Sequence, residues 1–125
     1  MNAVRRIPEP EPGALSAELT VVGDTAYTTV IPVDADGVLV EGIAAQSELC
    51  IDALEAELAR VGAGLADVAH LTIYLTDLAV NRPVFNEVYA RRFGATVPVR
   101  CAVGVAELGR PGVLVEPTGI AGVAG

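Results

Sequence analysis

The stretch VAHLTIYLT at residues 68–76 decides the fold, because its strict alternation predicts the central strand of a sheet. Ala69 and Leu71 begin a face that continues with apolar side chains. His70 and Thr72 begin an opposite face of polar and aromatic ones. Successive side chains of a strand point to opposite sides. One face is therefore expected in the core, and the other needs a different partner.

Helical patterns flank this strand on both sides. From about residue 43, a single stripe recurs at helical spacing, and Gly62 is placed to end it. The stripe consists of Ser47, Cys50, Ile51, Leu54, Leu58 and Val61. A second helix is predicted over residues 82–93, with Asn81 as its cap and Pro83 in its first turn.

The remaining elements are predicted to be strands. A hairpin turns at Gly23-Asp24, and Pro117 interrupts the last strand, which favours an edge position for it. If the strand at 97–105 and the last strand form a simple hairpin, an even register would place Arg100 and Glu116 on one face. The predicted strands are 19–22, 26–31, 38–40, 97–105 and 113–116.

This order predicts one α+β domain over residues 1–125, with an extended lead-in at 1–13 and a flexible tail at 120–125. Both helices cover one face of a single sheet. The other face is expected to carry His70, Tyr74 and the small residues beside Arg100. Because 52% of the residues are hydrophobic, this face is expected to be a subunit interface with ligand sites between chains.

Charge and composition exclude several classes of function. The net charge is −8, which disfavours nucleic acid and anionic membranes as partners. All eight basic residues are arginines, so Schiff-base and covalent pyridoxal chemistry are ruled out, and no cofactor is expected. A single histidine gives little support to a metal site. No apolar run is long enough for a membrane span, and proline and glutamate follow Arg5 and Arg6, so we expect a cytoplasmic protein.

Arg100 is the strongest candidate for a binding residue. Every second residue after it is small, namely Ala102, Gly104 and Ala106, which predicts a space beside a fixed positive charge. A guanidinium is suited to a carboxylate, so this pattern favours a small organic acid. An arginine paired with an acidic side chain, at the surface or at a subunit contact, fits the local pattern equally well. Cys101 is expected on the opposite face as an unreactive core thiol.

Several separated motifs resemble the RidA/YjgF imine deaminase family, from about Val22 to Ala121. They are GAGLADV at 62–68, TIYLTDL at 72–78, FNEVY at 85–89, PVRC at 98–101 and Val115-Glu116. The resemblance implies a homotrimer with a chorismate-mutase-like fold and sites at subunit interfaces. It also implies hydrolysis of enamine or imine intermediates of amino acids to 2-keto acids and ammonia, without a metal.

The resemblance also implies roles for individual residues. Arg100 matches the arginine that binds the substrate carboxylate, and Glu116 the glutamate that holds the attacking water. Asn86 matches an asparagine that orders the site. Without the resemblance, Glu116 is equally a solvated carboxylate at a strand end, Asn86 a surface helix residue, and Tyr89 a core residue rather than a catalytic one. His70 is expected to be structural or interfacial rather than a proton donor.

This chain departs from the family pattern at the pocket. The family carries Ser-Gly-Gln before Ile-Pro, where this chain has Thr28, Thr29 and Val30, and a family cysteine is replaced by Ala102. The resemblance makes Thr29, Val30 and Tyr89 candidate substrate-binding residues with altered selectivity. Two alternatives to the deaminase therefore stay open: an enzyme acting on another small carboxylate, and a trimer that binds such an acid without catalysis.

Overall fold

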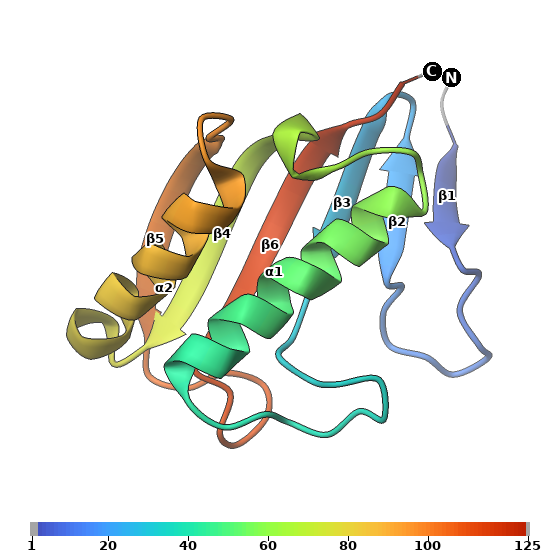
Figure 1. Ribbon diagram of the computed structural model, residues 1–125. Coiled ribbons are helices and arrows are strands. Elements are labelled where there is room, and N and C mark those ends of the chain that lie inside the picture. The colour runs from blue at the N-terminus through green and yellow to red at the C-terminus, as the bar shows by residue number, and fades with distance from the viewer. Residues whose placement is uncertain (1–2, 125) are drawn as a thin grey trace.

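The alternating stretch at 68–76 forms β4 (Val68–Thr76), the longest strand of a six-stranded sheet (Figure 1). Two α-helices pack on one face of this sheet, as the sequence predicts. The computed structural model describes residues 3–124. The other elements are β1 (Val4–Ile7), β2 (Leu19–Val22), β3 (Thr25–Thr29), α1 (Ile43–Ala59), a 3-10 turn (Leu65–Asp67), α2 (Leu78–Phe93), β5 (Val99–Val105) and β6 (Val115–Gly122).

The strand order is β1-β2-β3-β6-β4-β5, so β5 and β6 are not neighbours. This corrects the simple hairpin considered for them. The chain crosses from β4 through α2 to β5, and these two strands run parallel because such a crossover reverses the chain direction twice. β6 enters between β3 and β4, antiparallel to both. β5 therefore forms one edge of the sheet, and β6 lies in its middle.

Pro117 consequently lies in a central strand and not at the predicted edge. Its carbonyl accepts a hydrogen bond from the Val30 amide at 3.1 Å, just beyond the end of β3. In an antiparallel ladder the amide and carbonyl of one residue point to the same side. The missing N–H of Pro117 therefore faces Val30, just past the end of β3, so only the reciprocal bond of this terminal pair is lost.

α1 buries the predicted stripe against the sheet. Five of its six predicted residues are buried, and Val61, half-buried, lies just past the helix end. Gly119 lies beneath the helix, where an added Cβ would come within 3.1 Å of Leu54. The small residue therefore allows the helix and sheet to approach closely. The hairpin of β2 and β3 around Gly23-Asp24 is also confirmed.

α2 begins a turn earlier than predicted. Asp77 takes a left-handed conformation, with φ at 47°, and the helix starts at Leu78 directly after it. Asn81 lies inside the helix, not at its cap, and donates a hydrogen bond to the Thr76 carbonyl at 2.7 Å. Pro83 is exposed in the second turn, where water can satisfy the carbonyl left without a helical partner.

Segments near both ends of the described chain take part in the sheet. Residues 4–7 fall within the predicted lead-in, yet they form β1 and pair with β2. Residues 120–122 fall within the predicted tail, yet they complete β6. The strand predicted at 38–40 is reduced to a single bridge between Val33 and Leu39. Both ends gain order from hydrogen bonding to neighbouring strands that local patterns do not reveal.

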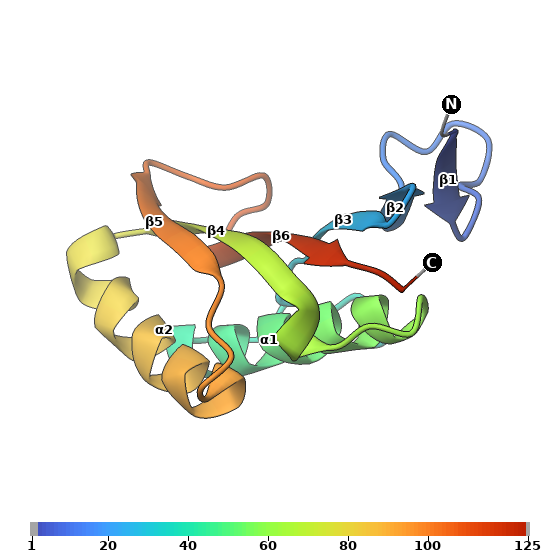
Figure 2. The same ribbon diagram turned by 90° about the horizontal axis from the view of Figure 1, so that it is seen from above.

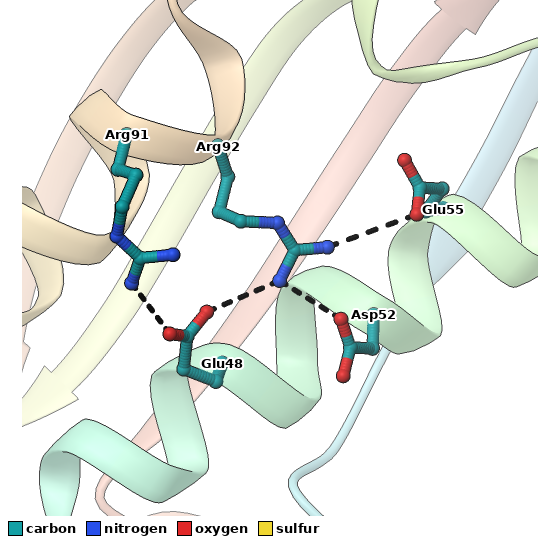
Figure 3. Close-up of polar contacts among 5 residues, drawn as sticks. All are labelled: Glu48, Asp52, Glu55, Arg91 and Arg92. Atoms are coloured by element: carbon teal, nitrogen blue, oxygen red, sulfur yellow. Dashed lines mark hydrogen bonds and ion pairs between the residues drawn. The ribbon is translucent and has the colours of Figure 1, made fainter.

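A cluster of ion pairs joins the two helices on their outer side (Figure 3). Arg92 on α2 contacts three carboxylates of α1: Asp52 at 2.8 Å, Glu48 at 3.1 Å and Glu55 at 3.7 Å. Arg91 pairs with Glu48 as well. The hydrogen bond from Arg91 holds the pKa of the Glu48 carboxyl below its usual range. These contacts fix α2 against α1, and α2 in turn carries residues of the candidate site.

Figure 2 shows both helices on the same side of the sheet, and the opposite side of β3, β6, β4 and β5 carries no helix. We call this the open face. The strand register aligns its residues in rows across the sheet. One row contains Cys101, Thr72, Thr118 and Thr29. The next row contains Val103, Tyr74 and Glu116.

Candidate functional site

Arg100 lies on β5 opposite Leu71 of β4, and Leu71 belongs to the buried core beneath the helices. Directly paired residues of adjacent strands share a face. Arg100 therefore points to the helix-covered face and not to the open face where the sequence analysis expected it. The small residues in its row have a different use as well. Ala102 packs against the core, and an added Cβ on Gly104 would meet Leu78 of α2 at 3.1 Å.

Residues of α2 hold the Arg100 guanidinium in place. Its Nη2 donates a hydrogen bond to Asn86 Oδ1 at 2.7 Å. The guanidinium carbon lies 4.5 Å from the ring centre of Tyr89 and 5.9 Å from that of Phe85, within the range of cation–π attraction. No salt bridge involves Arg100 among residues 3–124. The cation is therefore fixed without being neutralised, and it remains available to an acid from outside.

Tyr89 combines a packing role with this contact. It is buried and stacks on Phe85 and Phe93, so the expected core position is correct. Burial raises the pKa of the Tyr89 hydroxyl, and the charge of Arg100 partly offsets this. Its hydroxyl oxygen is buried without a hydrogen-bond partner in the part of the chain that the structure describes. The ring of Tyr89 contacts the guanidinium of Arg100, and the hydroxyl lies close enough for the charge of Arg100 to act on its pKa.

Glu116 lies on the open face. It pairs with Tyr74 of β4, three residues along from Leu71, and an odd separation along a strand reverses the face. Arg100 and Glu116 of one chain therefore lie on opposite faces of the sheet, with β4 between their strands. The shared face considered from a hairpin register is wrong, because β5 and β6 do not pair.

A cavity of about 800 Å³ lies beside Glu116. Its wall on β3 and β6 includes Tyr27, Thr29, Glu116 and Thr118, and Val30, just past the end of β3, also lines it. The structure thus brings together three of the predicted site residues, Thr29, Val30 and Glu116, and leaves Arg100, Asn86 and Tyr89 outside this cavity. The sequence analysis did not identify Thr118. Its position two residues after Glu116, on the same face of a strand, was the available signal.

The cavity extends past the end of β3 to α1, where Ala53 and Glu57 line it. Burial raises the pKa of the Glu57 carboxyl, the charge of Arg60 lowers it, and that of Glu18 raises it further. Arg60 forms ion pairs with both carboxylates, at 3.0 Å to Glu18 and 3.6 Å to Glu57. Glu57 gave no signal in the sequence, because its helical position alone does not reveal which cavity it reaches.

The two cysteines lie in different surroundings. Cys50 is buried on α1, where burial raises the pKa of its thiol and the charge of Glu116 adds to the rise. Cys101 is exposed on the open face of β5, which corrects its expected place in the core. The error follows from the face of Arg100, because adjacent residues of a strand alternate. Both thiols are free.

Metal and membrane sites gain no support. Residues 3–124 contain no group of three or more His, Cys, Asp or Glu side chains arranged to hold a metal ion. None of the helices in this part of the chain is long and apolar enough to cross a membrane. His70 on β4 pairs with Val99 of β5 and Ile120 of β6, and its side chain is half-buried.

Comparison with known proteins identifies the family. The family model described as Endoribonuclease L-PSP matches residues 9–123. The chain therefore belongs to this family, which is the RidA/YjgF family that its motifs resemble. The match runs from the loop after β1 to just past the end of β6, so it spans both parts of the candidate site.

Three relatives illustrate the family. A 3-aminoacrylate deaminase RutC from Acinetobacter baylyi is 33% identical over 117 residues, covering 91% of each chain. The Rid family protein YyfA from Yersinia pestis is similar in structure, with a TM-score of 0.87 and 30% identity over 97% of this chain and all of that one. TdcF from E. coli, solved with bound serine, has a TM-score of 0.81 and 29% identity over 90% and 93% of the two chains. The fold and the family are therefore shown, and the family includes deaminases.

Proposed function

We propose that this protein hydrolyses enamine or imine intermediates of amino acids to 2-keto acids and ammonia. The observation that carries the proposal is the state of Arg100, which is fixed by Asn86 and Tyr89 and has no acidic partner among the described residues. Such a guanidinium is prepared for a carboxylate ligand. The deaminase named among the relatives and the serine bound to TdcF support a small carboxylate substrate.

The substrate would contact two chains. Arg100 and Glu116 lie on opposite faces within one chain, so both can reach one small molecule only if they come from different copies. Arg100 is on the edge strand β5, from which its side chain can reach beyond the sheet into a neighbouring copy. A homotrimer around the open face, with three such sites, is the assembly we propose.

The chemistry requires positioning more than a strong catalyst. The carbon of an imine is already electrophilic, so the main needs are a water molecule in place and a path for its proton. Glu116 would orient the water and accept its proton as the oxygen bonds to this carbon. The proton then passes to the nitrogen to give a carbinolamine. Glu116 would next take the hydroxyl proton of this carbinolamine and deliver it to the nitrogen as the C–N bond breaks, so that ammonia leaves a 2-keto acid. Neither a metal nor a cofactor takes part.

A coupled assay tests the proposal. An amino acid oxidase generates the imine, and its loss of absorbance is followed with and without the protein. We expect the wild type to accelerate the decay, and Arg100→Ala to lose most of this effect because the carboxylate is no longer held. Arg82→Ala is a matched control, since Arg82 is an exposed arginine on the same helix as Asn86.

The outcomes separate the claims. A wild type that leaves the decay unchanged contradicts deamination of this substrate class. Equal acceleration by wild type and Arg100→Ala would show that Arg100 does not hold the substrate. The same loss in Arg82→Ala would assign the effect to general charge and not to the site.

Binding without turnover is the second candidate, favoured by the replacement of the family Ser-Gly-Gln by Thr28-Thr29-Val30 at the cavity. Stabilisation against heat by 2-keto acids, lost in Arg100→Ala, in a protein that leaves imines untouched would favour this role.

We do not propose the endoribonuclease activity in the family description, because the net charge is −8. Three of the arginines, Arg60, Arg91 and Arg92, are already paired with acids. Two free thiols support action in the cytoplasm.

A further inference from the structure

A row of threonines crosses the open face beside Glu116. Thr72 of β4 pairs with Thr118 of β6, which pairs with Thr29 of β3. The hydroxyls of Thr29 and Thr118 lie 2.9 Å apart and form a hydrogen bond. Only these two members of the row line the cavity that also contains Glu116.

The hydroxyl pair has hydrogen-bonding capacity left over. One hydroxyl donates its hydrogen to the other, so the accepting hydroxyl keeps a free hydrogen and both oxygens keep unused lone pairs. Both side chains are exposed to the cavity in this chain. When a ligand or a partner chain displaces the water, these groups need a polar partner, because an unpaired polar group out of water costs about 1–3 kcal/mol.

The pair lies at a defined place relative to the reacting carbon. Thr118 is two residues after Glu116 on the same face, which separates the two positions by about 7 Å. If Glu116 holds the water at the reacting carbon, the hydroxyl pair lies alongside the substrate's side chain a few bonds further on. Tyr27, Val30 and Ile31 also line the cavity, and its other polar lining residues are Ser16, Glu18, Thr20, Thr28 and Glu57.

We propose that Thr29 and Thr118 form a subsite that selects intermediates with a hydrogen-bonding side chain, such as a carboxamide or hydroxyl, over aliphatic ones. This inference rests on the proposed function and specifies the substrate class of the same site. A pocket that hydrogen-bonds a substrate group rejects the analogue that lacks it far more strongly than a pocket that only senses size. The preference is therefore expected to exceed tenfold in kcat/KM.

The test uses two substrates of the same shape. A broad-specificity amino acid oxidase generates the imines of asparagine and leucine, whose side chains differ mainly in replacing a carboxamide with an isopropyl group. We expect the wild type to favour the asparagine imine. We expect Thr118→Val and Thr29→Val to reduce this ratio of kcat/KM by about tenfold, the equivalent of one lost hydrogen bond.

Valine has the shape of threonine and suits a strand, so these variants are expected to fold. Thr72→Val is the matched control, because Thr72 is in the same row but does not line the cavity. Its substrate ratio is expected to equal that of the wild type. Thermal unfolding and the oligomeric state are measured for all variants.

Binding of the two corresponding 2-keto acids separates the claims. A preference for the polar keto acid that Thr118→Val abolishes supports the subsite even if no imine is consumed, in which case the proposed deamination fails alone. Turnover of both imines with an equal ratio in wild type and variants overturns the subsite and leaves the deaminase standing. If Thr72→Val changes the ratio of kcat/KM as much as Thr118→Val does, the subsite is also overturned. If the protein neither consumes the imines nor binds either 2-keto acid, both the proposed deaminase and the subsite are contradicted.

Discussion

Arg100 and Glu116 occupy contrasting surroundings on opposite faces of one sheet. Arg100 is half-buried at the edge strand, between an amide and an aromatic ring of α2 from its own chain. Glu116 is in a central strand, beside a cavity on the face that no helix covers. The Arg100 cation is therefore positioned by its own chain, whereas the cavity beside Glu116 is open to another molecule.

The largest loss of activity is expected from replacing Arg100. Replacing Arg100 with alanine removes a fixed charge that has no substitute nearby, so kcat/KM for the imine should fall by about 100- to 1000-fold. Steady-state kinetics on the coupled assay measure this. Arg100→Lys is expected to recover only part of the activity, because an ammonium lacks the planar fork of donors. Full activity of the lysine variant would show that charge alone is sufficient.

A smaller effect is expected from the aromatic support of Arg100. Tyr89→Leu removes the ring beneath the guanidinium, a contact worth about 1 kcal/mol, so KM should rise about fivefold. Tyr89→Phe keeps the ring and removes a buried hydroxyl that has no partner in residues 3–124, so both KM and stability should be retained. If the phenylalanine variant lost affinity as the leucine variant does, the hydroxyl and not the ring would be the functional group.

The smallest effect is expected on the cavity side, at Glu57. Its folded-state pKa is raised, so its contribution to stability is present at acidic pH and is lost as the pH rises through that pKa. Glu57→Gln should therefore match the wild type at low pH and exceed it at neutral pH by no more than about 1 kcal/mol. Denaturant unfolding at several pH values measures this difference. A stability gap that grows as the pH falls would contradict the sign.

Local pattern was sufficient for much of the fold. The alternation at 68–76, the stripe beginning at Ser47 and the turn at Gly23-Asp24 each predicted an element that the structure contains. These signals depend on neighbours within one or two turns of chain. The insertion of β6 between β3 and β4 depends on pairing between distant segments, and no local pattern determines it.

The sequence predicts the wrong face of the sheet for Arg100. The row of small residues predicts space for a ligand, but in the structure Gly104 allows the close approach of α2, and Ala102 packs against the core. A strand followed by a helix and another strand already indicates a parallel crossover with α2 on one face, but which residues of β5 lie on that face depends on the register with β4. Thr29 and Val30, which the resemblance makes candidate substrate-binding residues, line the cavity beside Glu116, and their role stays a prediction.

Mixing two inactive variants tests the central claim, that one site takes Arg100 from one copy and Glu116 from another. Arg100→Ala and Glu116→Gln are coexpressed in equal amounts, and all oligomers are purified together as a random mixture. If the site spans two chains, about a quarter of the sites in a random mixture contain both native residues, and activity returns to about that fraction of the wild type. Wild type mixed with the double variant provides the reference, expected at about a quarter for a shared site and about half for a site within one chain. No recovered activity in the first mixture, with about half in the second, would contradict the account.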